Sequence, residues 1–189
     1  MKVFSRSMIF PSIFFIGVCL VSNGCTSDRD LRKEIRAFYK TEINLPEHFL
    51  KIQSGKISDF CDYSDSDFTY VQFYGVGDCS DCAIEKITAY ERIFELCDSL
   101  QNVTPLIIFS PSVDDMPEVI EKIVAKNFSF PLFIDDTSAL NDATVIPVNP
   151  TFHSFLLSKD KHPVMVGNPI AGDALKSLFV NIVSSDSNI

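Results

Sequence analysis

Length, composition and charge limit the kinds of function open to this chain. It has 189 residues, and 25 Asp and Glu against 16 Lys and Arg give a formal net charge of −9 at pH 7. Because so acidic a surface repels phosphate groups, we expect neither nucleic acid as a partner nor electrostatic adhesion to an anionic membrane. The length suits one domain with its own core, and 17 Phe without any Trp predict that this core is rich in phenylalanine.

The N-terminus predicts a secretory signal peptide. Lys2 and Arg6 form a short basic region, and the apolar run 8–21 has 14 residues, fewer than the roughly 20 that a membrane-spanning helix needs. The small residues 22–24 then precede Cys25. This arrangement resembles the processing site of bacterial lipoproteins, in which the cysteine becomes the lipid-modified first residue of the mature chain.

We therefore expect residues 1–24 to be a lipoprotein-type signal peptide and Cys25 to carry a lipid that anchors the chain to a bacterial membrane. The protein would then lie outside the cytoplasm, on the periplasmic side or at the cell surface. Ordinary cleavage nearby is the alternative, and it would leave Cys25 as a free thiol, which is a liability outside the cell. The mature chain would keep 14 basic residues against 25 acidic ones, a net charge of −11.

An N-terminal unit, residues 25–67, precedes the predicted domain. Apolar residues at helical spacing predict a short helix over 27–40. Residues 41–52 are interrupted by a proline and predict an edge strand or a wrapping arm. Residues 53–67 are polar and acidic and predict a mobile connection to the domain over 68–189.

The domain alternates strands and helices and then ends in a hairpin and a helix. Runs of β-branched and aromatic residues predict the strands, and apolar spacings of three and four predict the helices. In chain order we expect a strand over 68–75, a helix ending near residue 100, a strand over 104–110, a helix over 114–127, a strand over 128–135, hairpin strands over 152–158 and 162–167, and a helix over 173–183. Such alternation implies parallel crossovers, so the predicted fold class is α/β, a mixed central sheet with helices on both faces.

Cys79 and Cys82 lie between the first strand of the domain and the helix that follows it, in the run GVGDCSDC. The first turn of a helix has unpaired N–H groups and the positive end of the helix dipole, so it stabilises a thiolate at Cys79, which is the reactive form. Cys82 is close enough to close a disulfide and to resolve a mixed intermediate. The pair is therefore interpreted as redox-active, with a fixed structural disulfide as the alternative.

A metal site at the pair is not expected. Metal binding usually needs four ligands, and the chain has no second CxxC. The histidines His48, His153 and His162 are not at ligand spacings. No other cofactor is expected.

The order strand, CxxC helix, strand, helix, strand, hairpin and helix resembles the thioredoxin-like superfamily, and the N-terminus points to its extracytoplasmic TlpA-like members. The hairpin segment FHSFLLSKDKHPVMVGNP over 152–169 also resembles that family, and the likeness covers roughly 68–183. It implies a thioredoxin-like fold and thiol–disulfide exchange, in which Cys79 attacks and Cys82 resolves. The implied partners are thiols and disulfides of exported proteins and a membrane electron donor.

Two positions depart from the family pattern. Asp78 stands where relatives usually have Trp. Relatives also place a cis-proline and then Thr at the start of the hairpin strand, against the disulfide; Pro150 and Thr151 offer this pair two residues early, and Phe152 takes the proline's place in the usual register. We expect Pro150, Thr151 and Phe152 to form the substrate-binding loop, with Pro150 or Phe152 against the cysteines.

The departures also support a function of another class. In this second interpretation the chain is a non-catalytic thioredoxin-fold lipoprotein with a structural disulfide, which serves as a binding or assembly module. A peroxidase of the peroxiredoxin type is ranked low, because Val76 stands where such enzymes have Thr.

Other polar residues of the domain are given structural roles. Cys97 belongs to the apolar stripe of its helix and is predicted to be buried, and Cys61 and Cys97 either pair or both stay free. His153 alternates with Phe on a strand, which indicates a surface or half-buried position and not a catalytic base. Asp135 and Asp136 end a strand, where solvation accounts for them.

Two opposing fields act on Cys79. The helix start stabilises its thiolate, whereas Asp78 and Asp81 disfavour a second negative charge nearby. If these fields offset each other, the disulfide is hard to reduce, with a potential nearer to the roughly −270 mV of thioredoxin than to the roughly −120 mV of a strong oxidant. The placement also predicts that Cys79 is partly exposed and that Cys82 is more buried.

Overall fold

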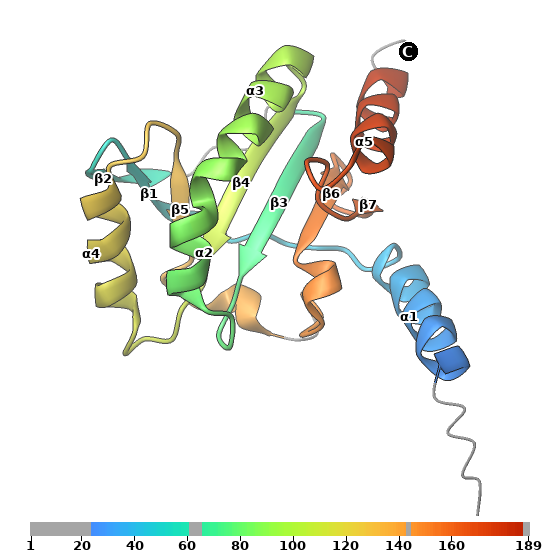
Figure 1. Ribbon diagram of the computed structural model, residues 1–189, viewed down its shortest axis with the longest axis horizontal. Helices are drawn as coiled ribbons and strands as arrows, with labels where there is room; N and C mark the ends of the chain where they lie inside the picture. The colour runs from blue at the N-terminus through green and yellow to red at the C-terminus, as the bar shows by residue number, and fades with distance from the viewer. Residues whose placement is uncertain (1–23, 61–65, 143–144, 187–189) are drawn as a thin grey trace, which may run out of the picture.

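The computed structural model describes residues 24–60, 66–142 and 145–186. Within these ranges, a mixed sheet of seven strands has the order β2-β1-β5-β4-β3-β6-β7 (Figure 1). The strands are β1 (Phe49–Gln53), β2 (Lys56–Phe60), β3 (Phe68–Tyr74), β4 (Val103–Phe109), β5 (Leu132–Ile134), β6 (Ser154–Ser158) and β7 (Pro163–Val166). β3, β4 and β5 are parallel, and the other pairs are antiparallel.

The helices follow the predicted order, with one division. The α-helices are α1 (Gly24–Phe38), α2 (Ser80–Lys86), α3 (Glu91–Leu100), α4 (Met116–Lys126) and α5 (Asp173–Asp186). The single helix predicted to end near residue 100 is α2 followed by α3, with the 3₁₀ turn η1 (Ile87–Tyr90) between them. Two further 3₁₀ turns, η2 (Ala139–Asn141) and η3 (Pro150–Phe152), precede β6.

Alternation along the strands divides the core between the two faces of the sheet. On β3, Val71 and Phe73 point to the face that α1 covers, whereas Tyr70 points to the face that α3 and α5 cover. β4 follows the same rule, with Leu106 on the first face and Ile107 on the second, where α2 and α4 pack. The sheet therefore has helices on both faces, as predicted, and the chain follows the predicted order of a βαβ unit, a hairpin and a closing helix.

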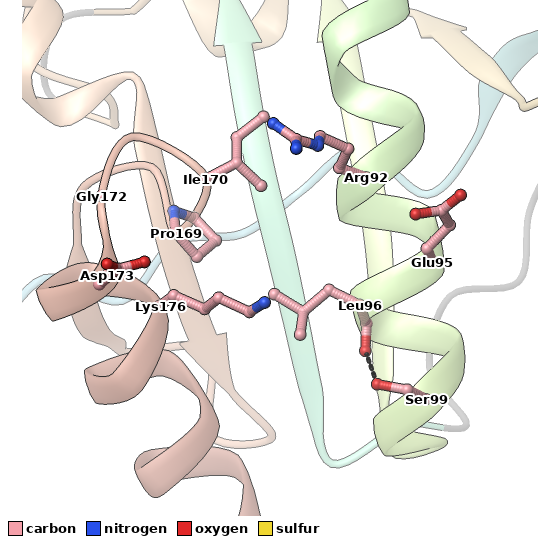
Figure 2. Close-up of a pocket in the computed structure, with 9 residues that line it drawn as sticks. All are labelled: Arg92, Glu95, Leu96, Ser99, Pro169, Ile170, Gly172, Asp173 and Lys176. Atoms are coloured by element: carbon pink, nitrogen blue, oxygen red, sulfur yellow. Dashed lines mark hydrogen bonds between the residues drawn. The ribbon is translucent and has the colours of Figure 1, made fainter.

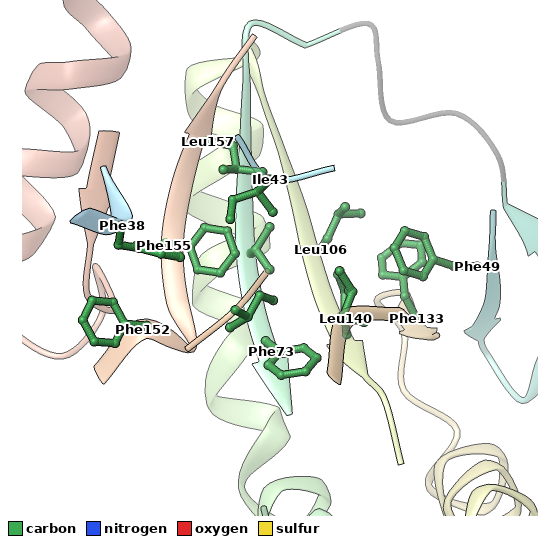
Figure 3. Packing of buried hydrophobic residues seen from close by; sticks show 13 residues of the cluster. Phe38, Ile43, Phe49, Phe73, Leu106, Phe133, Leu140, Phe152, Phe155 and Leu157 are labelled. Atoms are coloured by element: carbon green, nitrogen blue, oxygen red, sulfur yellow. The ribbon is translucent and has the colours of Figure 1, made fainter. Parts of the chain in front are cut away.

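Phenylalanine dominates the core on the face that α1 covers, as the composition predicted. Of the 13 buried residues in this cluster, six are Phe, and Figure 3 shows their packing. The Phe38 ring at the end of α1 meets the rings of Phe152 and Phe155 edge-on, with centroids 5.1 and 5.4 Å apart. These contacts attach α1 to the domain.

Residues 41–53, which precede β3 in the chain, pack on the domain and add a strand to its sheet. Residues 41–45 are the predicted wrapping arm: Ile43 is fully buried, and its N–H donates to the carbonyl of Lys161 at 2.8 Å. β1, however, is not an edge strand, because it pairs with both β2 and β5.

β2 forms the edge of the sheet inside the segment that was predicted to be a mobile connection. Ser54 and Gly55 both have positive φ, at 50° and 67°, and close a hairpin turn between β1 and β2. The side chains of β2 are almost all exposed and mostly polar, so the strand lacks the apolar alternation by which strands are recognised. Residues 61–65, the rest of that connection, lie outside the described residues.

Within the described ranges, no helix combines the length and the apolar composition that crossing a bilayer requires. The predicted signal peptide lies outside the described residues except for Gly24, the first residue of α1.

Candidate functional site

The candidate site is the disulfide between Cys79 and Cys82 at the carboxyl end of β3. Their Cα atoms are 5.2 Å apart. Cys79 is the N-cap residue of α2, and its Sγ accepts a hydrogen bond from the N–H of Cys82 at 3.2 Å. The sulfur therefore satisfies one of the unpaired donors at the start of the helix, which is the interaction that would stabilise a thiolate there.

Both cysteines are exposed, so a polypeptide can reach the disulfide from solution. The exposure of Cys79 agrees with the prediction, whereas Cys82, predicted to be the more buried of the two, is exposed as well. α2 instead buries its next turn, at Ala83 and Ile84, against the sheet. The first turn of the helix stands clear of the core.

The loop from Gly75 to Asp78 leads directly into Cys79, and its conformation depends on two glycines. A Cβ at Gly75 would lie 2.7 Å from the ring of Phe73 and 2.8 Å from Oδ1 of Asn141, so only glycine fits there. Gly77 has φ of +100°, a conformation that residues with a side chain rarely adopt. The two glycines of the run GVGDC are thus required by the shape of the loop.

Asp78 and His153 join this loop to the segment before β6. Oδ2 of Asp78 accepts a hydrogen bond from the N–H of Gly75 at 2.9 Å and lies 3.1 Å from Nδ1 of His153. Nε2 of His153 is 3.2 Å from the carbonyl oxygen of Pro147. His153 is half-buried, as expected, but it also holds the acidic residue next to the first cysteine. The pair could not be found from the sequence, because only the fold brings the two residues together.

Asp81, the other acidic residue beside the cysteines, is paired with a cation from α4. Nζ of Lys122 lies 2.6 Å from Asp81 and 2.6 Å from Glu118. The hydrogen bonds to Asp81 and Glu118 raise the pKa of Lys122 to about 12, and the bond to Asp81 contributes most. Neither acidic residue beside Cys79 therefore stands alone, a feature that the expected balance of fields did not include.

A groove of about 480 Å³ opens beside the disulfide. Tyr74 and Tyr90 form part of its wall, and their hydroxyl groups are 3.1 Å apart, with Tyr74 donating. Burial raises the pKa of both tyrosines above the ordinary value of about 10, so their hydroxyl groups keep their protons into the alkaline range. The residues that line the groove are Tyr74, Asp78, Cys79, Cys82, Ala83, Lys86, Ala89, Tyr90, Asn168, Ile170 and Ala171.

A second cavity, of about 410 Å³, lies between α3 and α5 and shares Ile170 with the groove. Figure 2 shows the side chains of Arg92 and Lys176 reaching into the space between the two helices, while the carboxylate of Glu95 points away from it. The two hollows thus adjoin at Ile170, and the second extends the surface beside the disulfide along α3.

The residues predicted to form the substrate-binding loop lie elsewhere. Pro150 and Thr151 are exposed in η3, and Phe152 is fully buried against Phe38. None of the three lines a cavity beside the disulfide. Among the described residues no peptide bond is cis, so Pro150 does not have the geometry of the family's cis-proline. Their role in substrate binding stays a prediction.

The other predicted positions divide into buried and undescribed. Cys97 is a free, buried thiol, and burial raises its pKa to about 12, so it is unreactive in the folded protein. Asp135 is predicted to be solvated, but the structure buries it fully, and three donors satisfy its carboxylate. Cys61 lies outside the described residues. In the described part of the chain, no three His, Cys, Asp or Glu residues are placed to hold a metal ion.

Neither a family profile nor a curated protein sequence matches the chain. Several solved structures match it at low identity. A domain of a possible thiol-disulfide isomerase from Cytophaga hutchinsonii is 13% identical, covering 78% of this chain and 96% of its own, with a TM-score of 0.47. Yeast Sco1 with copper bound is 14% identical, covering 79% and 95%, with a TM-score of 0.48. StoA from Bacillus subtilis is 18% identical, covering 65% and 88%, with a TM-score of 0.39.

Proposed function

We propose that this protein is a thiol–disulfide oxidoreductase that acts on disulfides of exported proteins through Cys79 and Cys82. The observation that carries the proposal is the exposed disulfide whose first sulfur caps α2. The adjoining groove, with its tyrosine wall and apolar alanine and isoleucine side chains, suits a polypeptide segment more than a small polar molecule.

The reaction begins from the reduced pair. The Cys79 thiolate attacks one sulfur of a substrate disulfide, which forms a mixed disulfide and releases the other substrate sulfur as a thiolate. The Cys82 thiolate then attacks the Cys79 sulfur and releases the second substrate thiolate. Two electrons pass to the substrate and the Cys79–Cys82 disulfide forms; two protons from solvent complete the substrate thiols. A dithiol donor at the membrane restores the reduced pair.

The direction of electron flow follows from how weakly the thiolate is stabilised. α2 has seven residues and ends in a 3₁₀ turn, so few peptide dipoles are aligned behind Cys79. The adjacent Asp78 opposes a negative charge on the sulfur. The reduced form is therefore poorly favoured, and we expect a potential nearer to about −270 mV than to about −120 mV.

Equilibration of the purified protein against glutathione buffers, with alkylation and mass spectrometry to count free thiols, tests the proposal. We expect Cys79 and Cys82 to become reduced together and Cys97 to stay unmodified in the folded protein. In a second assay, the Cys82→Ser variant should accumulate a mixed disulfide at Cys79 with insulin, used as a probe of protein disulfides. A pair that never reduces under native conditions would refute the proposal.

A second function is favoured by the buried position of Phe152. If no residue before β6 holds the substrate against the disulfide, the pair is a structural disulfide and the domain is a binding or assembly module. Reduction of the disulfide would then lower the unfolding midpoint without any exchange with insulin.

We infer that the protein works outside the cytoplasm, anchored by a lipid on Cys25. The apolar run 8–21 and the small residues before the cysteine support this inference. α1 begins at Gly24, and its side chains pack against the core from Leu31 onward, so about 10 Å of helix would separate the anchor from the domain. Mass spectrometry of protein extracted from membranes tests the inference, and a mature chain that starts elsewhere without an acyl mass would contradict it.

A further inference from the structure

We propose that Asn141 is a positioning residue for the cysteine pair, through which a buried hydrogen-bond network holds the loop before Cys79. The inference rests on the proposed redox function. It concerns η2, a segment to which neither the sequence nor the family likeness gives a role.

The network starts at a buried carboxylate. Asp135 and Ser110 both have an exposed fraction of 0% and lie just after the ends of β5 and β4. Oδ2 of Asp135 accepts hydrogen bonds from Oγ of Ser110 at 2.8 Å and from the N–H of Leu140 at 2.9 Å, and Oδ1 accepts one from Thr137 at 2.7 Å. A buried carboxylate with this many donors is stabilised in one position and fixes its partners.

Asn141 joins this network to the loop. Its Nδ2 donates to the carbonyl oxygen of Ser110 at 2.9 Å and to Oγ of Ser110 at 2.8 Å. Its Oδ1 accepts a hydrogen bond from the N–H of Val76 at 2.8 Å. Both amide hydrogens are therefore used on the buried side, and the oxygen is used on the loop side. An aspartate could not donate to Ser110, and an apolar residue could make none of the three bonds.

The loop from Gly75 to Asp78 is attached at two consecutive N–H groups, one of them bonded to the Asn141 amide. Val76 is exposed at 62%, so its N–H would otherwise be free to move with the solvent-facing loop. Asp78 accepts the preceding N–H, that of Gly75. Two side chains from different directions thus fix consecutive N–H groups of the loop that ends at Cys79.

This attachment determines how well Cys79 caps α2. The bond from the N–H of Cys82 to the Cys79 sulfur requires the loop to deliver the sulfur to the first turn of the helix. If Asn141 is lost, the loop gains freedom and the capped geometry is populated less. A thiolate at Cys79 is then less stabilised, so it reacts more slowly near neutral pH and the disulfide is harder to reduce.

The test compares Asn141→Ala and Asn141→Leu with the unsubstituted protein. In glutathione buffers we expect the ratio [GSH]²/[GSSG] at half-reduction to rise about three- to tenfold, the range of a lost capping interaction. In protein reduced beforehand with a phosphine, we expect alkylation of Cys79 by iodoacetamide to slow by a similar factor. Asn181→Ala is the matched control, because Asn181 is exposed on α5. It should change neither readout.

The outcomes separate this inference from the function on which it rests. If the unsubstituted protein never equilibrates with glutathione, the proposed function fails, and the alkylation rates of the pre-reduced proteins still decide the role of Asn141. If the Asn141 variants match the unsubstituted protein or the Asn181→Ala control in both readouts, the inference is overturned. If neither Asn141 variant folds, Ser110→Ala replaces them; it keeps one Asn141 bond to Ser110, and a smaller shift in the same direction is expected, while no shift overturns the inference.

Discussion

At the scale of single residues, the charge on Asp81 is balanced by one cation. Lys122 is the only basic residue in the described part of the chain that forms an ion pair with Asp81, at 2.6 Å. In Lys122→Gln, Asp81 stays charged without this partner, so the Cys79 thiolate is disfavoured. We expect the [GSH]²/[GSSG] ratio at half-reduction to rise about two- to fivefold at low salt, and the effect to shrink at about 0.5 M salt because exposed charges are screened.

Lys126 provides the control for that prediction. It pairs with Glu85 at 2.7 Å and also joins α4 to α2, one turn farther from the cysteines. Lys126→Gln removes a similar surface ion pair from the same two helices, so any effect from their packing appears in both variants. A shift of equal size in the two variants would contradict a specific role for Lys122.

At the scale of elements, η3 and Phe152 serve the core. Phe152 is fully buried and contacts Phe38 of α1. Phe152→Ala leaves a cavity and should lower the free energy of unfolding by about 3–5 kcal/mol, measured by urea denaturation. The equilibrium with glutathione should stay the same, because Phe152 lines neither the groove beside the disulfide nor the cavity between α3 and α5.

The outcome of that substitution also bears on the sequence expectation for this segment. If Phe152→Ala shifts the glutathione equilibrium severalfold while the stability hardly changes, the residue belongs to the substrate site, as the sequence resemblance predicts. Thr151→Ala is the control for the turn itself, since Thr151 is exposed.

The elements that the sequence predicted correctly are those with a periodic apolar pattern. β3 follows from its sequence, because six of its seven residues are β-branched or aromatic. β2 could not be predicted, since an edge strand with exposed polar side chains has no alternation to recognise. The division between α2 and α3 at η1 also has no clear signal in the sequence.

The site could be predicted only as far as local sequence reaches. Cys79 and Cys82 are three residues apart at the start of one helix, so the sequence alone places their sulfurs within reach of each other. His153 and Asn141 were missed because each acts on the loop from a distant part of the chain. A buried carboxylate such as Asp135 looks solvated in sequence, because its three donors come from other segments or from a turn whose shape is not evident.

At the scale of the whole molecule, burial of acidic hydroxyl and thiol groups makes the stability depend on alkaline pH. Tyr70 and Cys97 lie in the same cluster beneath α3 and α5, with exposed fractions of 0% and 1%. Burial raises the pKa of Tyr70 and raises that of Cys97 to about 12. In the unfolded chain the pKa values return to the usual ones, about 10 for Tyr70 and about 8.5 for Cys97.

Since the folded form keeps these protons longer, the unfolded form binds fewer of them as the pH rises. Their contribution to stability is therefore complete below about pH 8.5 and falls as the pH approaches the folded values, by up to about 1.4 kcal/mol per pH unit for each group. Urea denaturation between pH 7 and 11 should show a decline that begins with Cys97 and steepens when Tyr70 joins. Cys97→Ala should remove the early part of the decline, and Tyr70→Phe should reduce the later part, to which the buried hydroxyl groups of Tyr74 and Tyr90 also contribute. Tyrosinate absorbance that rises in full while the protein is still folded would contradict the assignment to burial.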